Sequence, residues 1–464
     1  MSTPDAGVSS TAPELSYAAA LRAIEDRGRY GIRLGLGRVR ALLRAVDDPQ
    51  LAVRGALVAG TNGKGSVIAL AASALRAAGY RVGETPKPHL VSYRERIVVN
   101  GRPIEPDVFA RLVARVLPIA DRITPRLGPP TEFELLTAIM FLHFADAALD
   151  VALVEVGLGG RLDATHAWDG GVAVVTNVDL DHTDQLGPTI RAIAREKAAI
   201  IERGDIAVTG ATGDALPVIR ARCARMGVPL TVTHDARVVG WTRDTLDVSL
   251  PQLGHVAVAL RGRHQAANVA VADALLDALE AAGIARASAD DRRRGYARVR
   301  WPGRLELLDV ARGDGTACEV LLDGAHNPAG GAALAGALDD LRPWLAGGRN
   351  AVPPRVTLVW AAMRDKDVAG VLAAVGAAHS VAGARIVCTA LDLPRAMPAT
   401  DLADAWRATL PGAEVSVARD VDAAMDQALA TAVGPIVVAG SLYLVGTVRS
   451  RLVDDPLLRD PVAA

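Results

Sequence analysis

The chain has 464 residues, more than the roughly 250 to 300 that one hydrophobic core accommodates, so we expect two domains. Half of the residues are hydrophobic but only 3% are aromatic, a composition typical of helices packed on parallel strands. The 51 basic and 52 acidic residues balance, which excludes a global electrostatic attraction to nucleic acid or to an anionic membrane.

Cysteine usage and the N-terminus indicate an intracellular protein. Cys223, Cys318 and Cys388 are widely spaced and odd in number, which favours neither a disulfide framework nor a cysteine-ligated metal. The N-terminus lacks the basic and apolar regions of an export signal, and no run of about 18 residues is apolar throughout. We therefore expect a cytoplasmic monomer without nucleic-acid or membrane partners.

Hydrophobic patterning along the first part of the chain alternates helices and strands. Residues 1–14, rich in Ser, Thr, Pro and Ala, are predicted to be a flexible tail. A helix is expected over about 15–27, and a second helix follows a glycine-rich turn. Short apolar strands are predicted at 55–60, 150–157 and 171–178. This alternation predicts an α/β fold with a mainly parallel sheet.

The later part of the chain is predicted to form a second, smaller domain. Residues 231–260 alternate short strands, which predicts an antiparallel patch at the edge of the first sheet. The charged segment 291–310 contains a Trp-Pro-Gly turn and is the predicted linker, so we place the boundary near residue 300. The first domain then covers 15–300, and alternating strands and helices over 301–464 indicate a Rossmann-like domain.

A glycine-rich loop, called the phosphate loop below, joins the first strand to a helix. Small residues let its backbone wrap phosphates, Lys64 can reach the β and γ oxygens, and Ser66 offers a hydroxyl near Mg2+. The spacing departs from the full Walker pattern, because Gly65 separates Lys64 from Ser66 and position 58 is Val58. An ordinary strand-to-helix turn remains the alternative. The loop consists of Gly60, Thr61, Asn62, Gly63, Lys64, Gly65 and Ser66.

Two further strand ends carry groups suited to a metal ion. Glu155 ends a buried strand, where ligands collect in open α/β sheets, and its carboxylate suits Mg2+. The alternative is a charge paired with Arg161. His182 follows the next strand among several aspartates, which favours a functional role over a structural one. Lys197 lies beside Glu196 in a helical pattern, and by itself this pair indicates a solvated helix face.

Together and in this order, the motifs resemble the folylpolyglutamate synthase/dihydrofolate synthase branch of the Mur ligase family. The resemblance runs from about residue 30 to 450. It implies a P-loop ATPase domain, a Rossmann-like C-terminal domain that receives the amino acid, and catalysis in the cleft between them. The matching segments are GTNGKGS, PHL with RERIVVNG, TEFELLTA, LVEVGLGGRLDAT, LDHTDQLG, AREKAAI, GRHQAANVAVA, WPGRLE, LDGAHNPAG and GSLYLVG.

The resemblance also implies the roles of individual residues. Glu155 and His182 would bind Mg2+, and Lys197 would be a lysine carbamylated on its amine, which turns a cation into an anion able to help hold the metal. With Lys64, these three residues form the implied catalytic set.

Further residues are implied at the nucleotide and at the acceptor. Asn268 would meet the adenine, Arg304 a phosphate, and Asp323 with His326 the nucleotide or an acyl phosphate. Without the family, a surface Asn, a linker Arg and a helix N-cap Asp are the alternatives. The implied acceptor site consists of Gly35, Leu36, Gly37, Arg38, Thr131, Phe133, Asp163 and Ala164.

Lys87 is the main departure from the family pattern, which has a serine there whose hydroxyl binds Mg2+. A protonated ammonium has no lone pair and repels the ion. We predict that the Lys87 amine points at phosphate oxygens rather than turning away from the site.

The implied activity is an ATP-dependent ligation that requires Mg2+ and serves folate biosynthesis and one-carbon metabolism. L-glutamate would be added to dihydropteroate or to folate polyglutamates through an acyl phosphate, with release of ADP and phosphate. Two alternatives remain at this point: a Mur-type ligase for a different acid, and a nucleotide-binding regulator without catalysis.

Overall fold

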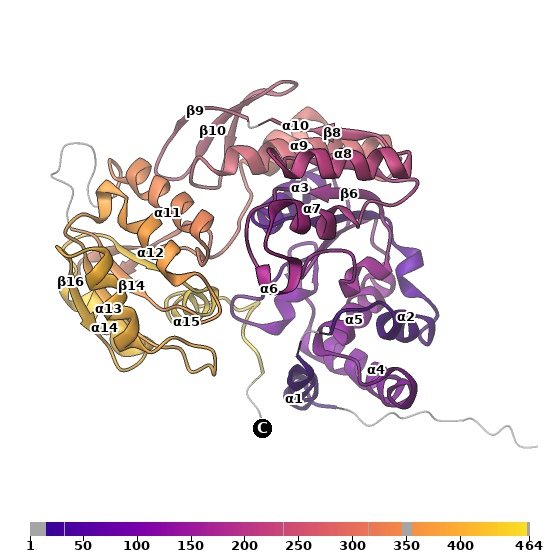
Figure 1. The fold of residues 1–464 in the computed structure, drawn as a ribbon, viewed down its shortest axis with the longest axis horizontal. Coiled ribbons are helices and arrows are strands. Elements are labelled where there is room, and N and C mark those ends of the chain that lie inside the picture. The colour runs from indigo at the N-terminus through magenta and orange to yellow at the C-terminus, as the bar shows by residue number, and fades with distance from the viewer. Residues whose placement is uncertain (1–14, 32, 235, 314, 346–354, 462–464) are drawn as a thin grey trace, which may run out of the picture.

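The structure is a computed structural model organised around two large sheets. An eight-stranded sheet forms before residue 233 and a six-stranded sheet after residue 305, on opposite sides of the molecule (Figure 1). Below, residues 15–300 are the N-terminal part and residues 301–461 the C-terminal part. The flexible tail predicted at 1–14 lies outside the described residues. The described residues are 15–31, 33–234, 236–313, 315–345 and 355–461.

The eight-stranded sheet has the order β4-β3-β2-β5-β1-β6-β7-β8, and all its pairs from β2 to β8 are parallel. Its central strands are buried along their whole length, because helices cover both faces. The predicted α/β fold with a mainly parallel sheet is confirmed. The strands are β1 Gly55–Ala59, β2 Val82–Thr85, β3 Val98–Val99, β4 Arg102–Pro103, β5 Val151–Glu155, β6 Gly171–Val175, β7 Ile206–Thr209 and β8 Leu230–Val232.

Helices on the two faces of this sheet build two separate hydrophobic cores. Successive residues of β1 point to opposite faces, so Leu57 packs in one core and Val58 in the other. The helices are α1 Tyr17–Glu25, α2 Gly37–Arg44, α3 Lys64–Ala77, α4 Pro106–Leu127, α5 Glu132–Asp146, α6 Thr183–Leu186, α7 Ile190–Ala198, α8 Ala215–Met226, α9 Gln265–Ala281 and α10 Ala289–Tyr296.

The segment predicted as a linker, 291–310, is only partly a connection, because α10 occupies its beginning. Gly295 in α10 lies so close to α3 that a Cβ there would stand 2.4 Å from the Cα of Ala74. Ser73 of α3 donates a hydrogen bond of 2.7 Å to the carbonyl of Gly295. The beginning of this segment is therefore a helix packed against α3. We still propose domains of 15–300 and 301–464, and the connection between α10 and the next strand supports this division.

The antiparallel strands expected at the edge of the first sheet form a sheet of their own. Strands β9 Arg237–Trp241, β10 Leu246–Leu250 and β11 Gly254–Val258 pair in the order β11-β10-β9, and only β8 joins the edge. Alternate residues of β10 are buried because they pack in the core beneath α9. Figure 1 shows this sheet reaching toward the C-terminal part, where the Trp241 indole donates a 3.0 Å hydrogen bond to the Asp340 carbonyl.

The six-stranded sheet has the order β12-β13-β17-β14-β15-β16, and only β12 is antiparallel to its neighbour. Its strands are β12 Glu306–Ala311, β13 Ala317–Leu322, β14 Thr357–Trp360, β15 Arg385–Cys388, β16 Glu414–Val417 and β17 Ile436–Ala439. Its helices are α11 Pro328–Leu341, α12 Val368–Gly376, α13 Ala399–Thr409, α14 Val421–Thr431 and α15 Leu442–Leu452. In the described part of the chain, no helix is long and apolar enough to cross a membrane.

After α15, the chain returns from the C-terminal part to the N-terminal part. Arg94, which is buried, donates hydrogen bonds to the carbonyls of Leu457 and Arg459, at 2.8 and 3.0 Å. Its Nε also donates to the Asp460 carboxylate at 2.9 Å. One arginine therefore fastens the C-terminal segment to the loop that follows β2.

Arg94→Ala should free this segment, because the change leaves two carbonyls without their donor and the Asp460 carboxylate with the Ser92 hydroxyl alone. We expect the free energy needed to detach the C-terminal segment to fall by about 2 to 3 kcal/mol. Chymotryptic cleavage near Leu457, measured under native conditions, should then be roughly 30- to 150-fold faster. Arg419→Ala removes a surface ion pair with Asp420 and should leave cleavage within about twofold. Equal cleavage of the two variants would contradict this role of Arg94.

Candidate active site

Four parallel strands end side by side and bring four loops to one edge of the eight-stranded sheet. In the order β2, β5, β1, β6, these strands lead into Lys87, Glu155, the phosphate loop and residues 176–182. Val58 of β1 is paired with Glu155 of β5, so the carboxylate lies next to the start of the phosphate loop. Sites of open α/β sheets form at this edge.

The exit of β6 supports the backbone of the phosphate loop. The Thr176 hydroxyl donates to the Asn62 carbonyl at 2.7 Å, and the Asn177 side-chain oxygen accepts the Asn62 N–H at 2.8 Å. The Thr61 hydroxyl exchanges hydrogen bonds with the backbone of Asp179, at 3.0 and 3.2 Å. Gly60, at φ +155°, fits only without a side chain, because a Cβ would lie 1.8 Å from the Thr176 hydroxyl.

Lys64 and Glu155 meet beneath this loop. The Lys64 ammonium donates to the carbonyls of Gly60 and Thr61, at 3.0 and 3.1 Å, and lies 3.9 Å from a Glu155 oxygen. Glu155 is buried, and burial raises the pKa of its carboxyl, while Lys64 and Lys87 oppose that shift. The alternative pairing of Glu155 with Arg161 is wrong, because Arg161 pairs with Glu196 at 2.9 Å.

Lys197 is buried rather than on a solvated helix face. From α7 its amine donates a 2.8 Å hydrogen bond to the Gly60 carbonyl. Among the residues that the structure describes, no carboxylate oxygen lies within 4.0 Å of this amine. Burial lowers the pKa of Lys197 to about 7. A large fraction of the amine is therefore neutral near physiological pH, and a neutral amine is a nucleophile.

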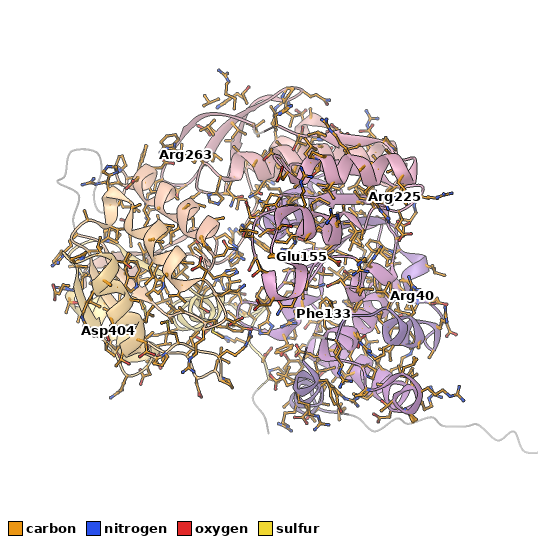
Figure 2. All side chains as sticks on the ribbon, viewed as in Figure 1. Arg40, Phe133, Glu155, Arg225, Arg263 and Asp404 are labelled. Carbon is orange, nitrogen blue, oxygen red and sulfur yellow. The ribbon has the colours of Figure 1, made fainter. Side chains whose placement is uncertain are left out.

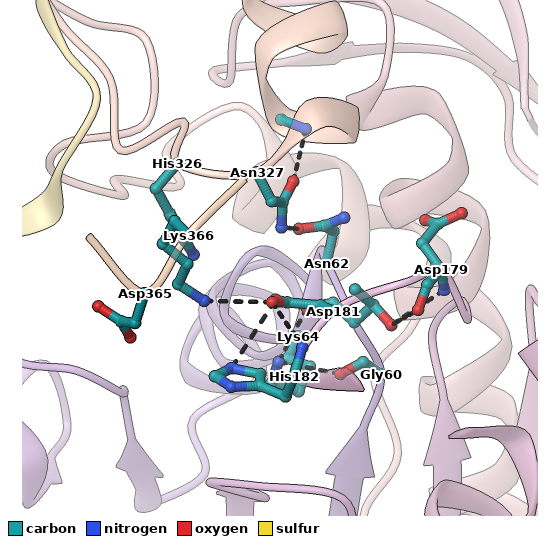
Figure 3. A network of polar contacts seen from close by, with 12 residues as sticks. Gly60, Asn62, Lys64, Asp179, Asp181, His182, His326, Asn327, Asp365 and Lys366 are labelled. Carbon is teal, nitrogen blue, oxygen red and sulfur yellow. Dashed lines mark hydrogen bonds and ion pairs between the residues drawn. The ribbon is translucent and has the colours of Figure 1, made fainter. Parts of the chain in front are cut away.

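The C-terminal part meets the phosphate loop directly (Figure 3). Asn327 caps α11 and donates from its amide nitrogen to the side-chain oxygen of Asn62 at 3.1 Å. Lys366, after β14, pairs with Asp181 at 3.1 Å, and Asp181 lies 3.8 Å from the ring of His182. Two polar contacts therefore join the two parts at the position where a nucleotide's phosphates would lie.

Arg304, Asp323 and His326 enter the site from the C-terminal part. The Asp323 carboxylate accepts backbone N–H groups of Leu305 and Ala325, each at 2.9 Å, which fixes the turn after β13. Burial lowers the pKa of Arg304 and raises that of Asp323, while each charge opposes the other's shift. His326 Nδ1 lies 2.7 Å from the Gly324 carbonyl, and burial lowers its pKa to about 4, so the ring is neutral at pH 7.

The side chains of Asn268 and Trp301 pack against Gly63 and Gly65 of the phosphate loop. Asn268 lies on α9, donates to Gln265 at 2.7 Å, and approaches so closely that a Cβ on Gly63 would stand 2.1 Å from its oxygen. A Cβ on Gly65 would stand 2.4 Å from the Trp301 ring. The glycines at these two positions therefore let the loop pass under an amide and an indole.

These groups line one cavity of about 640 Å³ between the two parts. It is large enough for a nucleotide with a second ligand beside its phosphates. The cavity brings together all of the catalytic and nucleotide residues expected from the sequence. Those lining it are Gly60, Thr61, Asn62, Gly63, Lys64, Gly65, Ser66, Glu155, His182, Lys197, Asn268, Arg304, Asp323 and His326.

Of the expected acceptor residues, only Phe133 lines this cavity. Two of the others bond to residues outside the expected set: Gly35 N–H donates to the Leu162 carbonyl at 3.3 Å, and Arg38 pairs with Glu134 at 3.0 Å. Phe133 and Glu155 lie in the middle of the N-terminal part (Figure 2). The remaining members, which do not line the cavity, are Leu36, Gly37, Thr131, Asp163 and Ala164.

Two of these members have local structural roles. Thr131 caps α5 by accepting the Glu134 N–H. Asp163 accepts the N–H groups of Gly157 and Leu158, at 3.0 and 2.8 Å, and so holds the glycine-rich loop after β5.

Lys87 faces the cavity and is partly buried. Its ammonium donates to the Glu155 carbonyl at 2.6 Å and lies 4.3 Å from the centre of the Phe133 ring. Its backbone N–H donates to the Glu155 carboxylate at 3.2 Å. Burial lowers the pKa of Lys87 to about 8, so the protonated form still predominates at pH 7. The side chain does not turn away from the site.

The groups at the cavity fit a nucleotide-bound Mg2+. Within the described residues, no three His, Cys, Asp or Glu side chains gather closely enough to enclose a metal by themselves. Mg2+ beside a nucleotide needs only one or two protein ligands, because phosphates and water complete its coordination. Glu155, His182 and the Ser66 hydroxyl provide such donors at the cavity.

Sequence reasoning missed several residues of this site. Asn177 belongs to the strand-end segment that contains His182 but was given no role, and Lys366 lies outside every motif considered. Arg96, which also lines the cavity, was considered only as part of a matching segment. The position of Asn177 could have indicated a role, because it lies at the end of the strand predicted at 171–178, at this edge of the sheet. Lys366 and Asn327 reach the site only through the packing of the C-terminal part, which no local pattern encodes.

Comparisons with known proteins give concordant results. Residues 58–276 match the Mur ligase middle domain, and residues 306–452 match the dihydrofolate synthetase C-terminal domain. The dihydrofolate synthase/folylpolyglutamate synthase of Bacillus subtilis is 33% identical over 451 residues, covering 94% of this chain and 99% of that protein.

Two solved structures are similar over nearly their full length. Mycobacterium tuberculosis folylpolyglutamate synthase complexed with ADP and AMPPCP has a TM-score of 0.81 and 32% identity, covering 95% of this chain and 100% of that one. The bifunctional folylpolyglutamate synthase/dihydrofolate synthase of Yersinia pestis complexed with AMPPNP and Mn ion has a TM-score of 0.74 and 30% identity, covering 97% and 100%.

Asn177→Ala should weaken ADP binding by about 5- to 30-fold, because the Asn62 N–H loses its acceptor and the loop loses its shape. Titration calorimetry measures this change. Asn100→Gly is the matched control: it removes an amide that accepts the Val82 N–H far from the loop, at a φ of 51° that glycine adopts freely. Its ADP affinity should stay within about twofold, and equal affinity in both variants would contradict the bracing role.

Proposed function

Because the chain belongs to the dihydrofolate synthase/folylpolyglutamate synthase family of Mur ligases, we propose that its cavity joins a folate-type acid to L-glutamate. The enzyme is an ATP-dependent ligase of folate metabolism and uses ATP and Mg2+. One observation carries the assignment to this cavity: the phosphate loop and the C-terminal residues Asp323 and His326 line the same space. ATP, bound by the phosphate loop, and the acid and amine to be joined can therefore meet in this cavity.

The first step uses the N-terminal side of the cavity. An oxygen of the acceptor carboxylate attacks the γ-phosphorus of ATP, the bond to the β–γ bridging oxygen breaks, and ADP leaves with that electron pair. Lys64 and the loop N–H groups stabilise the charge on the transferred phosphoryl group, and Arg304 approaches it from the C-terminal part. The product is an acyl phosphate, which is far more electrophilic than a carboxylate.

The second step joins the amine to this intermediate. The glutamate nitrogen attacks the acyl carbon, the carbon–oxygen bond to phosphate breaks, and the departing phosphate takes the electron pair and a proton from the amine. The contacts of Asn327 with the phosphate loop and of Lys366 with Asp181 close the cavity from the C-terminal side. Such closure limits the access of water, which would otherwise hydrolyse the acyl phosphate.

Glu155, His182 and Ser66 are the residues that we propose to hold Mg2+. When bound, the ion supplies positive charge to the phosphates of ATP. The chain's own part is to present a buried carboxylate, an exposed imidazole and a hydroxyl at one cavity, with Lys64 beside the carboxylate.

We propose the Phe133 side of the cavity as the acceptor site. Phe133 offers an aromatic face, and the bonds of Arg38 to Glu134 and of Gly35 to Leu162 hold other residues of the expected acceptor site in place. Dihydropteroate and tetrahydrofolate both carry an aromatic pterin-type ring and a carboxylate, so both are candidate acceptors. We further propose a cytoplasmic monomer, because one chain supplies every group of the cavity and its three cysteines are unpaired.

The proposed function predicts ADP release that depends on both an acid and glutamate. ATP, L-glutamate and either dihydropteroate or tetrahydrofolate are incubated with the enzyme, and products are identified by mass. A product one glutamyl residue heavier identifies the acceptor. Lys64→Ala should reduce turnover by at least about 100-fold, because the loop loses its mobile cation. Nucleotide binding without ADP release for either acid would favour a regulator, and a Lys64→Ala rate within about tenfold of wild type would contradict the role of Lys64.

We also propose that Lys197 is carbamylated. Its amine is buried and has no carboxylate partner within 4.0 Å in the described residues, and the family resemblance points to this modification. The amine nitrogen attacks carbon dioxide and loses a proton, which yields a carbamate anion. That anion lies near Gly60, at the start of the phosphate loop.

Lys197→Ala should reduce turnover by about 100-fold, since the anion is lost, and added bicarbonate should not restore it. Formate or acetate should restore part of the rate by occupying the vacated anion site. Arg195→Ala removes an exposed cation of the same helix and should leave the rate within about twofold. Mass spectrometry under neutral conditions that finds only unmodified Lys197 in the active, nucleotide-bound enzyme would contradict the proposal.

A further inference from the structure

The distribution of lysine singles out residues of this site. Only four of the 51 basic residues are lysine, and the other 47 are arginine. Lys64, Lys87 and Lys197 line the cavity, and Lys366 pairs with Asp181, which also lines it. The chain therefore uses arginine for its general charge and places every lysine at the cavity. A lysine differs from arginine in its compact ammonium and removable proton, and the cavity is where this chain has that chemistry.

Lys87 and Lys197 are the two lysines without a carboxylate oxygen within 4.0 Å among the described residues, and of these only Lys87 has no proposed role so far. Lys64 and Lys366 have carboxylates within 4.0 Å, at Glu155 and Asp181. Lys87 has none at that distance among the described residues, although it approaches the Glu155 carbonyl and the Phe133 ring. A neutral carbonyl and a ring face compensate a partly buried cation less than an anion does. The cavity in front of Lys87 is therefore suited to an anionic group.

The position of Lys87 identifies this anion. Lys64 approaches one oxygen of the Glu155 carboxylate, and the Lys87 backbone donates to the other, so the two lysines flank Glu155 from different sides. Lys64 belongs to the phosphate loop, whereas the Lys87 ammonium rests on Phe133, on the acceptor side. The Lys87 ammonium therefore lies between Phe133 and Glu155, which separates the proposed acceptor side from the phosphate loop.

We propose that Lys87 binds the reacting carboxylate of the acceptor acid and keeps one carboxyl oxygen in place while the other attacks the γ-phosphorus. This role rests on the proposed ligation. It answers an electrostatic problem of the first step, because a carboxylate and a triphosphate repel each other as they approach. A fixed ammonium between them reduces this repulsion and orients the nucleophile, which raises the effective concentration of the attacking oxygen.

The test compares a charged acceptor with its neutral isostere in the ADP-saturated enzyme. The ligands are dihydropteroate or tetrahydrofolate, whichever the wild type ligates faster, and the same molecule with the reacting carboxylate converted to a primary carboxamide. Fluorescence titration gives both affinities. The wild type should prefer the acid by at least about tenfold, the effect of a charge-assisted hydrogen bond. In Lys87→Met this preference should fall below about threefold, while ADP affinity stays within about twofold.

Lys366→Met is the matched control, because it removes another ammonium from the same region but from the C-terminal side. It should keep the wild-type preference for the acid. If Lys87→Met fails to bind ADP, Lys87→Gln, which keeps a polar side chain, takes its place.

Three results would overturn the role of Lys87. If the Lys87 variant retained the wild-type preference for the acid, Lys87 would not bind the reacting carboxylate, while the proposed ligase function would be unaffected. An equal loss in Lys366→Met would show a general charge effect of the cavity. A wild type that ligates neither acid would refute the acceptor assignment itself, and the role of Lys87 with it.

Discussion

The phosphate loop depends on hydrogen bonds that come from outside it. Its glycines allow the close approach of phosphates but give the backbone no shape of their own, and a free loop of this composition would sample many conformations. Thr176, Asn177 and Asp179 hold it from the exit of β6. The amine of Lys197 holds the Gly60 carbonyl from α7. The loop is therefore a fixed surface between neighbouring elements, and its N–H groups are oriented before a nucleotide arrives.

The same loop is also where the two parts of the chain communicate. Asn327 contacts Asn62, and Lys366 contacts Asp181 next to His182, so a shift of the C-terminal part changes the surroundings of the phosphates. Elsewhere the parts are joined by Trp241 in the small antiparallel sheet and by the C-terminal segment on Arg94. These contacts hold the C-terminal residues of the cavity opposite the phosphate loop, an arrangement that suits the proposed reaction through an unstable intermediate.

Sequence patterns predicted the features that are encoded locally. The apolar strands, the phosphate loop and the acidic group at Glu155 were each recognisable from short segments, because burial and glycine leave a direct trace in the sequence. The segment 291–310 was predicted to be a linker because of its charge cluster and Trp-Pro-Gly turn, and the start of strand β12 within it was missed because its charged residues interrupt the apolar pattern. The contacts of Asn327, Lys366 and Lys87 depend on how distant segments pack. The resemblance marked Lys87 as unusual, but only the structure places its ammonium on Phe133.

Isotope transfer tests most directly whether the carboxylate attacks ATP in this cavity. An acceptor acid labelled with oxygen-18 in its reacting carboxylate is ligated to glutamate with unlabelled ATP in unlabelled water, and the released phosphate is analysed by mass spectrometry. An acyl phosphate transfers one carboxylate oxygen to phosphate, so each phosphate should carry one labelled oxygen and the amide should keep the other. Unlabelled phosphate, formed at the same rate as the amide product, would contradict the central claim that the acid is activated by phosphorylation.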